Sequence, residues 1–233
     1  MMRLDKYLAS MGFGTRNEVK KMLRKGIVAV NGEVVMKADR QIEEESDSVV
    51  VDGEEVVYQK YVYLMLNKPM GYISATKSSV ANVMDLIGEN FRDMFPCGRL
   101  DKDTEGLLLI TNDGPLAHQL LSPKKHVEKE YYVEVEKPLS ERDIQAFERG
   151  IYIDGGEYCS PAILKILGAN SCTLIIHEGK FHQIKRMFAA RDNAVTYLKR
   201  IRMKNLVLDE NLEPGEYRYL TQEEIADLRE CGN

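Results

Sequence analysis

The chain has 233 residues, enough for one large domain or for a medium-sized domain with a small appendage. Its content of 44% hydrophobic and 30% charged residues excludes wholesale disorder, and no apolar run reaches the ~20 residues that a membrane-spanning helix needs. The first residues lack the apolar core of a signal peptide, so we expect a cytoplasmic protein with no membrane partner.

Four cysteines are scattered along the sequence, at Cys97, Cys159, Cys172 and Cys231. None belongs to a C-x-x-C pair, and no histidine lies at a zinc-like spacing from them. Because scattered cysteines in a cytosolic chain are usually free thiols, we expect neither disulfides nor a structural metal.

The net charge of −5 argues against a nucleic-acid partner only as an average, since the charges are segregated. Residues 3–25 carry seven basic and two acidic side chains, and residues 177–204 carry eight basic and two acidic ones. Phosphate attraction is local and screened over ~10 Å, so either segment could bind a polyanion. Solvated protein faces carry such charge runs as well, and charge alone does not decide between the two interpretations.

Two short helices are predicted at the start of the chain. The apolar spacing of residues 4–11 is typical of a helix, and Gly12 to Gly14 breaks it. Thr15 and Glu18 then match a capping box, which predicts a second helix that runs to about Lys25. One arc of this helix is apolar, and the opposite arc carries five basic side chains, here called the basic ridge: Arg16, Lys20, Lys21, Arg24 and Lys25.

A small sheet is predicted after the helices. Asn31-Gly32 lies between two apolar runs and is a strong hairpin signal, and Asp52-Gly53 repeats the pattern. Residues 1–58 therefore form one expected domain. Gln59-Lys60 is a plausible joint, and residues 61–233 form the second expected domain.

The second domain is predicted to mix strands and helices without a regular βαβ repeat. This pattern favours an α+β fold with a mainly antiparallel sheet. Strands are expected at residues 61–66, 107–110, 131–135, 163–167, 172–176 and 217–220, a turn at 112–114, and helices at 80–87, 140–149, 182–190 and from 221 onward.

Three segments of the second domain carry chemically useful side chains. The first places Asp101, Asp103 and Glu105 in a loop that enters a buried strand, and a carboxylate there is a nucleophile, a base or a surface charge. The second contains Tyr131, on a strand face that belongs either to the core or to a pocket. The third, residues 177–187, is a polar turn that leads into a helix. Taken singly, the segments do not indicate a functional site: a solvated turn is favoured for the first and core packing for the second, and a solvated helix start also accounts for the third.

Together these segments resemble the RsuA-type family of ribosomal RNA pseudouridine synthases, which carry an N-terminal S4 RNA-binding domain. Residues 98–109 resemble its G-R-L-D motif, 64–71 its L-N-K-P motif, 129–131 its K-x-Y motif and 178–187 its E-G-x-x-H-Q-[VI]-K-R-M motif. Residues 1–58 resemble the S4 domain. The motifs occur in the family's order over nearly the whole chain.

The resemblance implies an enzyme that isomerises uridine to pseudouridine in ribosomal RNA, after the target base is flipped from its stack. It assigns Asp101 as the nucleophile, Tyr131 as the residue that stacks on the base, and Lys185 as the ion-pair partner of the aspartate. It further implies RNA contacts by the basic ridge and by Arg99, Lys68, His182, Gln183 and Arg186. The isomerisation consumes nothing, so no cofactor and no metal are expected.

The resemblance also implies ribosomal RNA or a pre-ribosomal particle as the partner of a monomeric protein. A Ser-Pro-basic-His run before the tyrosine, at residues 122–129, favours the small-subunit 16S target over the large-subunit 23S one. Two rival hypotheses stay open. One is a glycoside hydrolase that uses Asp101 with Asp103 or Glu105, and the other is a non-catalytic S4 protein of ribosome assembly.

Overall fold

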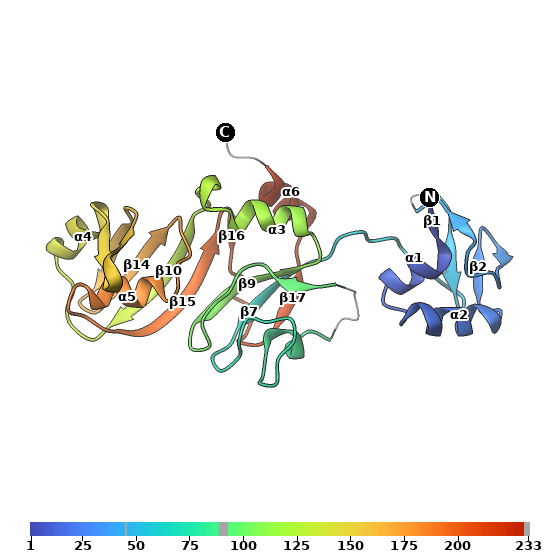
Figure 1. Cartoon of the computed structure of the whole chain (residues 1–233), viewed down its shortest axis with the longest axis horizontal. Helices are drawn as coiled ribbons and strands as arrows, with labels where there is room; N and C mark the ends of the chain where they lie inside the picture. The colour runs from blue at the N-terminus through green and yellow to red at the C-terminus, as the bar shows by residue number, and fades with distance from the viewer. Residues whose placement is uncertain (45, 89–92, 231–233) are drawn as a thin grey trace. The chain divides into compact units, whose positions relative to one another are not determined.

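A computed structural model gives the fold and describes residues 1–44, 46–88 and 93–230. The chain divides into two compact units, one built on Met1–Val62 and the other on Tyr63–Ile87 and the chain from Phe95 onward. Each unit has its own sheet (Figure 1). The three segments that carry chemically useful side chains all fall in the second unit.

The first unit packs two helices against a four-stranded antiparallel sheet of order β3-β2-β5-β6. Its core contains the apolar faces of both helices, including Leu8 and Leu23, and the strand residues Val28 and Val49. The elements are β1 (Met2–Arg3), α1 (Leu4–Ser10), α2 (Arg16–Arg24), β2 (Val28–Val30), β3 (Glu33–Val34), β4 (Gln41–Ile42), β5 (Val49–Val51) and β6 (Glu54–Glu55).

Local sequence signals account for the turns and caps of this unit. The predicted capping box is confirmed, because the Glu18 amide donates to Thr15 Oγ1 at 3.3 Å and the Thr15 amide donates to Glu18 Oε2 at 2.6 Å. Asn31 and Gly32 both adopt positive φ, 51° and 82°, as a tight hairpin turn requires. The two predicted helices and the predicted hairpin are therefore present.

The second unit is centred on a mixed sheet whose strands follow the order β13-β14-β10-β15-β9-β7-β17, with β16 paired to β15 and β8 paired to β9. The strands are β7 (Tyr63–Lys68), β8 (Phe95–Pro96), β9 (Glu105–Thr111), β10 (Lys129–Val135), β13 (Ile163–Gly168), β14 (Ser171–Ile176), β15 (Val195–Met203), β16 (Leu206–Val207) and β17 (Tyr217–Tyr219). The predicted α+β class and the mainly antiparallel sheet are confirmed.

A parallel pair, β9 with β15, joins the two halves of this sheet. Gly106 lies opposite Arg200 in this pair, and a Cβ atom at position 106 would lie 2.2 Å from the Arg200 carbonyl oxygen. Glycine is therefore required at this point, because it lets the two backbones approach closely. The strand that carries the aspartate loop thus joins the strand beside Tyr131.

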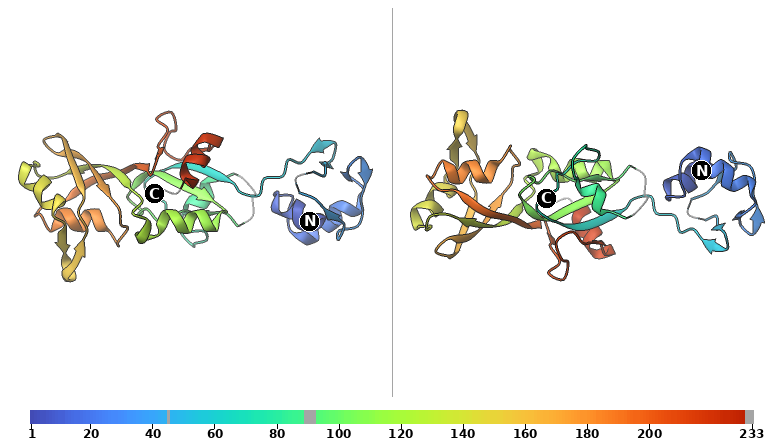
Figure 2. Two further views of the ribbon diagram at one scale, coloured as in Figure 1. Left: turned by 90° about the horizontal axis from the view of Figure 1, so that it is seen from above. Right: turned by 90° about the horizontal axis from the view of Figure 1, so that it is seen from below.

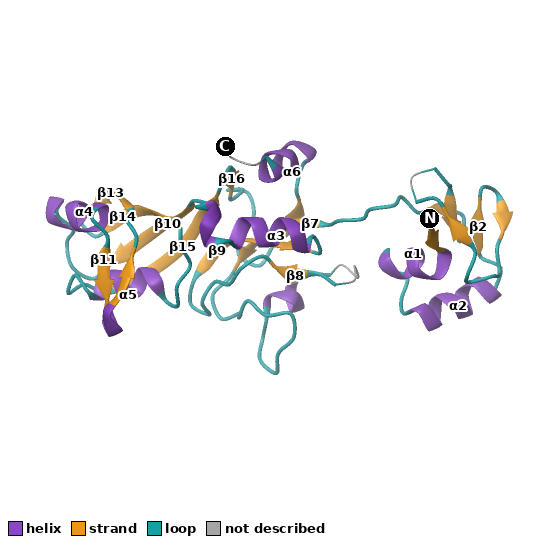
Figure 3. Cartoon of the chain, turned by 45° about the horizontal axis from the view of Figure 1, so that its top comes forward, coloured by secondary structure: helices purple, strands orange, loops and turns teal. Residues whose placement is uncertain are grey.

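The helices of the second unit differ in part from the predicted ones. They are α3 (Gly114–Leu121), α4 (Glu141–Glu148), α5 (Gln183–Ala189), α6 (Gln222–Arg229) and the 3₁₀ turns η1 (Val83–Leu86), η2 (Pro123–Lys125) and η3 (Asp154–Gly156). The helix expected at residues 80–87 is wrong, because only the four-residue η1 forms there and loop surrounds it (Figure 3). The turn expected at 112–114 begins α3 instead, since Asp113 Oδ1 accepts the Leu116 amide as a cap.

Several further elements were not predicted, among them one long strand and one hairpin. Strand β15 is partly charged, so its sequence reads as a solvated run, yet it pairs with both β10 and β9. The hairpin of β11 (Ile151–Ile153) and β12 (Glu157–Cys159) forms a separate two-stranded sheet. Views from above and below show this hairpin, in yellow, standing out from the main sheet (Figure 2).

The structure also tests the expectations on cysteine and membrane segments. Cys97, Cys159 and Cys172 are buried free thiols, as predicted, and Cys231 lies outside the described residues. No described helix has the length and apolarity that crossing a membrane requires.

Candidate active site

The three segments that carry chemistry meet in one cleft of the second unit. Its walls come from the loop before β9, from β10, from the end of β14 and from the turn into α5. The residues that line it are Arg99, Leu100, Asp101, Thr104, Tyr131, Ile176, Gly179, Lys180, His182, Gln183, Ile184, Lys185 and Leu198. A larger cavity elsewhere in this unit, lined by residues of η2, β15 and α6, contains none of the predicted catalytic residues.

Asp101 is the central charge of this cleft. Its Oδ2 lies 3.2 Å from Lys185 Nζ, and its Oδ1 lies 3.7 Å from His182 Nε2. Lys185 also contacts Asp103 Oδ1 at 2.5 Å. Burial by itself lowers the pKa of Lys185, but the hydrogen bonds to Asp103 and Asp101 outweigh it and raise that pKa above its usual value. The lysine is therefore a permanent cation between two carboxylates.

Tyr131 forms one wall of the cleft. It lies on the inward face of β10, where alternate residues are buried, and it is only 7% exposed. The sequence left the core and the pocket open as alternatives, and the structure shows features of both. The ring is largely buried, and it borders the same cleft as the Asp101 carboxylate.

Lys68 does not line this cleft, and its predicted role as an RNA contact is corrected. It is fully buried, and its ammonium donates to the backbone carbonyls of Thr104 at 2.7 Å, Pro69 at 3.1 Å and Lys102 at 3.4 Å. A buried ammonium whose three donors are occupied cannot reach a phosphate. Lys68 instead supports the Asp101 loop, and burial lowers its pKa to about 8.

The segment that follows Lys68 supports the same loop from a second side. The Gly71 amide donates to the Lys102 carbonyl at 2.8 Å. The Ser74 hydroxyl donates to the Leu100 carbonyl and accepts the Leu100 amide, both at 2.9 Å. Ser74 was missed, because a serine in a polar run carries no sequence signal for such a long-range contact. The segment 68–74 thus fixes the position of Asp101.

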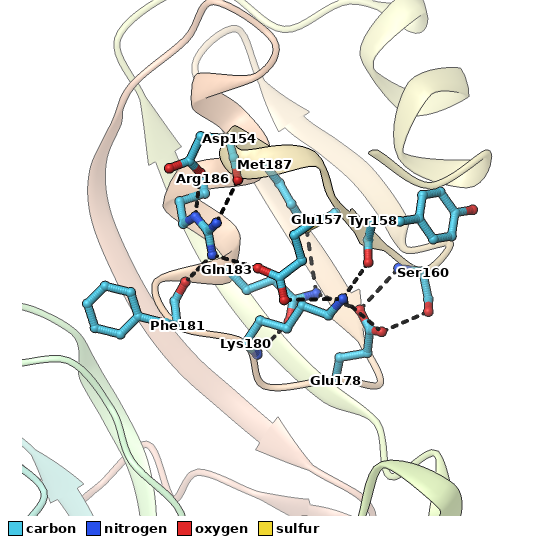
Figure 4. Close-up of polar contacts among 10 residues, drawn as sticks. All are labelled: Asp154, Glu157, Tyr158, Ser160, Glu178, Lys180, Phe181, Gln183, Arg186 and Met187. Carbon is cyan, nitrogen blue, oxygen red and sulfur yellow. Dashed lines mark hydrogen bonds and ion pairs between the residues drawn. The ribbon is translucent and has the colours of Figure 1, made fainter. Parts of the chain in front are cut away.

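Arg186 and Gln183 were also expected to contact RNA, and the structure gives both other partners. The Arg186 guanidinium donates to Asp154 Oδ1 at 2.5 Å, to Glu157 Oε2 at 3.0 Å and to two backbone carbonyls, as Figure 4 shows. Gln183 Nε2 donates to Glu178 Oε2, and Gln183 Oε1 accepts a hydrogen bond from the backbone amide of Lys180. Both side chains therefore tie the turn before α5 together, and Arg186 ties it to the β11–β12 hairpin.

The second basic segment, residues 177–204, is largely neutralised within the protein. Arg200 is buried, and its Nε donates to the Leu107 carbonyl. Arg202 pairs with Glu128 and Glu130, and the Lys204 ammonium donates to carbonyls at the end of α6. The charge pattern left open whether this segment binds a polyanion, and these contacts show that much of its basic charge has partners within the protein. Arg99 and His182, by contrast, are exposed at the cleft and free to contact a substrate.

The basic ridge remains on the surface of the first unit. Val19 and Leu23 of α2 are fully buried, while Arg16, Lys21 and Arg24 are exposed. In the described part of the chain, none of the five ridge residues forms an ion pair. The ridge therefore presents uncompensated positive charge, which suits a polyanion.

The charge state of the cleft argues against a glycoside hydrolase. Such an enzyme needs one protonated carboxylic acid beside an ionised carboxylate. The hydrogen bond from Lys185 instead lowers the pKa of Asp103 below its usual value. Glu105 accepts the Tyr197 hydroxyl at 2.6 Å and does not line the cleft. Among the residues that line the cleft, Asp101 therefore supplies the one carboxylate, and it lies in the same cleft as the Tyr131 ring.

Comparisons with known proteins agree with this geometry. Residues 62–190 match the family model described as RNA pseudouridylate synthase, and residues 2–56 match the S4 domain. A crystal structure of a pseudouridylate synthase is 39% identical and superposes with a TM-score of 0.69, covering 98% of this chain and all of the other.

Curated relatives are similar over nearly their whole length. A Bacillus subtilis protein described as an uncharacterized RNA pseudouridine synthase is 48% identical over 98% of this chain and 99% of its own. The proteins named ribosomal small subunit pseudouridine synthase A from Vibrio cholerae and Escherichia coli are 42% and 38% identical, each over 97% of this chain and 99% and 100% of their own.

Proposed function

The chain belongs to the RNA pseudouridylate synthase family and isomerises uridine to pseudouridine, and we propose that its target lies in small-subunit ribosomal RNA and that Asp101 is its catalytic carboxylate. The observation that carries the catalytic assignment is the Asp101–Lys185 ion pair at 3.2 Å beside Tyr131 in one cleft. The small-subunit target is supported by the names of the Vibrio cholerae and Escherichia coli relatives.

The reaction breaks the bond from N1 of uracil to C1′ of ribose and forms a bond from C5 to C1′. The proton leaves C5 and N1 gains one, so nothing is oxidised or reduced. The target base first leaves its stack, which costs a few kcal/mol. An ionised carboxylate then acts on the nucleotide as nucleophile, and Asp101 has the charge and the partial exposure that this step needs.

Neighbouring side chains hold this arrangement. Lys185 keeps a positive charge 3.2 Å from the Asp101 carboxylate and holds that side chain in the cleft. The Tyr131 ring stacks on the freed uracil and retains it while the base turns. Arg99 and His182, both exposed at the cleft, contact the phosphates or the base.

The basic ridge of α2 supplies affinity for structured RNA, since phosphate contacts set affinity and register while base contacts set specificity. The partner is ribosomal RNA or a pre-ribosomal particle, met by a monomeric protein in the cytoplasm. We place the boundary between the RNA-binding domain and the catalytic domain at residues 59–60, a few residues before the end of the first compact unit at Val62.

The decisive experiment replaces Asp101 by asparagine. Asp101→Asn removes the charge and keeps the shape, so the folded variant should form no pseudouridine in a small-subunit RNA transcript. Asp103→Asn is the matched control, because it removes a carboxylate that contacts the same Lys185 Nζ. The control should retain activity within about tenfold. Activity of Asp101→Asn within tenfold of the unmodified enzyme would contradict the assignment.

The target is tested by mapping pseudouridines in ribosomal RNA from cells that lack the protein. One missing pseudouridine in the small subunit, restored by the unmodified gene and not by Asp101→Asn, is the expected result. A missing site in the large subunit instead would correct the target and leave the catalytic assignment standing. Unchanged ribosomal RNA in both subunits would contradict the ribosomal target.

A further inference from the structure

Phe181 is an exposed aromatic residue at the rim of the cleft. It is 74% exposed, although both of its sequence neighbours, Lys180 and His182, line the cleft. Its ring stacks on the His182 imidazole with 3.8 Å between ring centroids and 21° between planes. His182 in turn lies 3.7 Å from the Asp101 carboxylate. A single imidazole therefore separates the Phe181 ring from the reacting carboxylate.

The backbone beneath this ring is held firmly. Arg186 Nη1 donates to the Phe181 carbonyl at 3.0 Å while the same guanidinium binds Asp154 and Glu157. Figure 4 shows the ring pointing away from these polar contacts. His182 adopts the left-handed conformation with φ of 47°, which few residues other than glycine adopt. The exposed ring is thus presented on a fixed backbone.

We propose that the outer face of the Phe181 ring stacks on the base of the nucleotide adjacent to the target uridine. The inference rests on the proposed function, because it places the target uracil between Tyr131 and Asp101. A nucleotide flipped into the cleft leaves its neighbour without a stacking partner on that side. Single-stranded bases stack readily on aromatic side chains, and every base has a face that suits them.

The chemistry of the rim fits an RNA strand. The Phe181 ring offers an apolar face, and the exposed Arg99 offers a guanidinium in the same cleft. An aromatic face beside a cation is the combination that binds single-stranded nucleic acid. Phe181 therefore positions the strand and contributes to the choice of target.

The chain contains no tryptophan, so Phe181→Trp introduces a single fluorescent reporter. Titration with a small-subunit RNA fragment that contains the target uridine should quench its emission, with saturation at one RNA per protein. The matched control is Leu167→Trp, because Leu167 is 53% exposed at the end of β13 that lies away from the cleft. Quenching of the Leu167→Trp reporter should be absent. Equal emission of Phe181→Trp with and without RNA would overturn the proposal.

Kinetics separate stacking from a merely structural role. Phe181→Ala and Phe181→Leu should raise KM for the RNA fragment by about 5- to 100-fold, with kcat within about threefold. Phe181→Tyr should restore KM, since it restores the ring. If Phe181 only supported His182, leucine would restore function and the defect of alanine would appear in kcat. Either that pattern or an unchanged KM in Phe181→Ala would overturn the proposal.

These outcomes are distinguishable from failure of the proposed function. The proposed function fails if the unmodified enzyme forms no pseudouridine in the fragment or if Asp101→Asn stays active. The stacking proposal fails while the unmodified enzyme remains active on the same fragment. Because Phe181 is exposed, its substitutions should leave the unfolding transition unchanged, which circular dichroism checks.

Discussion

At the scale of single residues, the site depends on side chains that share a partner. The Lys185 ammonium contacts the carboxylates of both Asp101 and Asp103. The Lys68 ammonium donates hydrogen bonds to three backbone carbonyls, those of Pro69, Lys102 and Thr104. Buried polar groups of this kind are stabilising only when each donor finds an acceptor. A motif residue can therefore support the site without reaching the substrate, as the buried Lys68 illustrates.

Tyr131 is predicted to act through its ring. Tyr131→Phe should bind an RNA fragment as tightly as the unmodified enzyme, and Tyr131→Ala should lose about 1–3 kcal/mol of binding free energy because the stacking face is gone. Because Tyr131 is largely buried, the alanine also costs stability. Val133→Ala is the control, because Val133 is buried on the same face of β10 and does not line the cleft. This variant should also lose stability, but it should bind the RNA fragment as tightly as the unmodified enzyme. Equal affinities of Tyr131→Ala and Val133→Ala would mean that the ring only packs.

Lys129 is predicted to make stability depend on pH. Burial, and then the nearby Arg200 charge, lower the pKa of Lys129 from 10.5 to about 8. Between these two values the unfolded chain binds a proton that the folded chain does not, so this group's contribution to stability rises with pH. From pH ~7.5 to ~9.5, the unfolding free energy should rise by on the order of 1 kcal/mol more in the unmodified protein than in Lys129→Met. Urea titrations measure both, and a constant difference would contradict the prediction.

At the scale of elements, the β11–β12 hairpin is attached to the active-site turn by charge. Arg186 reaches Asp154 and Glu157, and Lys180 contacts Glu157, Glu178 and the Tyr158 carbonyl. The planar guanidinium binds several acceptors at fixed angles, which an ammonium cannot do. The hairpin thereby becomes part of the wall that holds the turn before α5.

Arg186→Lys tests this attachment. The substitution keeps the positive charge and removes the planar guanidinium with its several donors, so we expect kcat/KM to fall by about tenfold. The unfolding transition should change little, because exposed ion pairs contribute about 0–1 kcal/mol to stability. Arg191→Lys is the control, since Arg191 makes an arginine–carboxylate pair with Asp143 elsewhere in the same unit. Equal kcat/KM for both variants would show that the hairpin does not position the turn.

At the scale of the whole molecule, we expect this acidic chain to bind RNA through local positive charge. The net charge is −5, yet the residues of the basic ridge form no ion pair within the described part of the chain. In the basic segment 177–204, by contrast, side chains such as Arg202 form ion pairs within the protein. Screening over ~10 Å makes the local field decide affinity. We therefore expect the first unit to supply most of the attraction to phosphate.

Deletion of residues 1–58 is predicted to weaken RNA binding and to spare catalysis. Each lost phosphate contact should flatten the slope of log affinity against log salt by roughly 0.7–0.9. The truncated enzyme should still convert uridine at high RNA concentration, because Asp101, Tyr131 and Lys185 lie in the other unit. A full-length variant with the five ridge residues changed to glutamine should show the same flattened salt slope as the truncated enzyme. An unchanged slope in both would assign the first unit another partner.

The sequence by itself determined the local structure and the chemical motifs. Capping boxes at Thr15, Ser140 and Thr221 and the turn at Asn31-Gly32 form through contacts within a few residues, so their signals are complete in the sequence. The resemblance to the family depended on four motifs in the family's order together with the S4-like first domain. The α+β class followed from the mixed pattern of strands and helices.

Tertiary structure alone decided which polar residues face the substrate and which support the site. Strand β15 and the β11–β12 hairpin are stabilised by partners far away in the chain, so their own sequences carry little signal. Lys68 and Arg186 lie in the family motifs, where basic residues that contact RNA would also lie. Only the structure shows that Lys68 is buried against backbone carbonyls and that Arg186 is paired with the β11–β12 hairpin. The physical reason is that a charged side chain looks the same in sequence whether its partner is a phosphate or the protein itself.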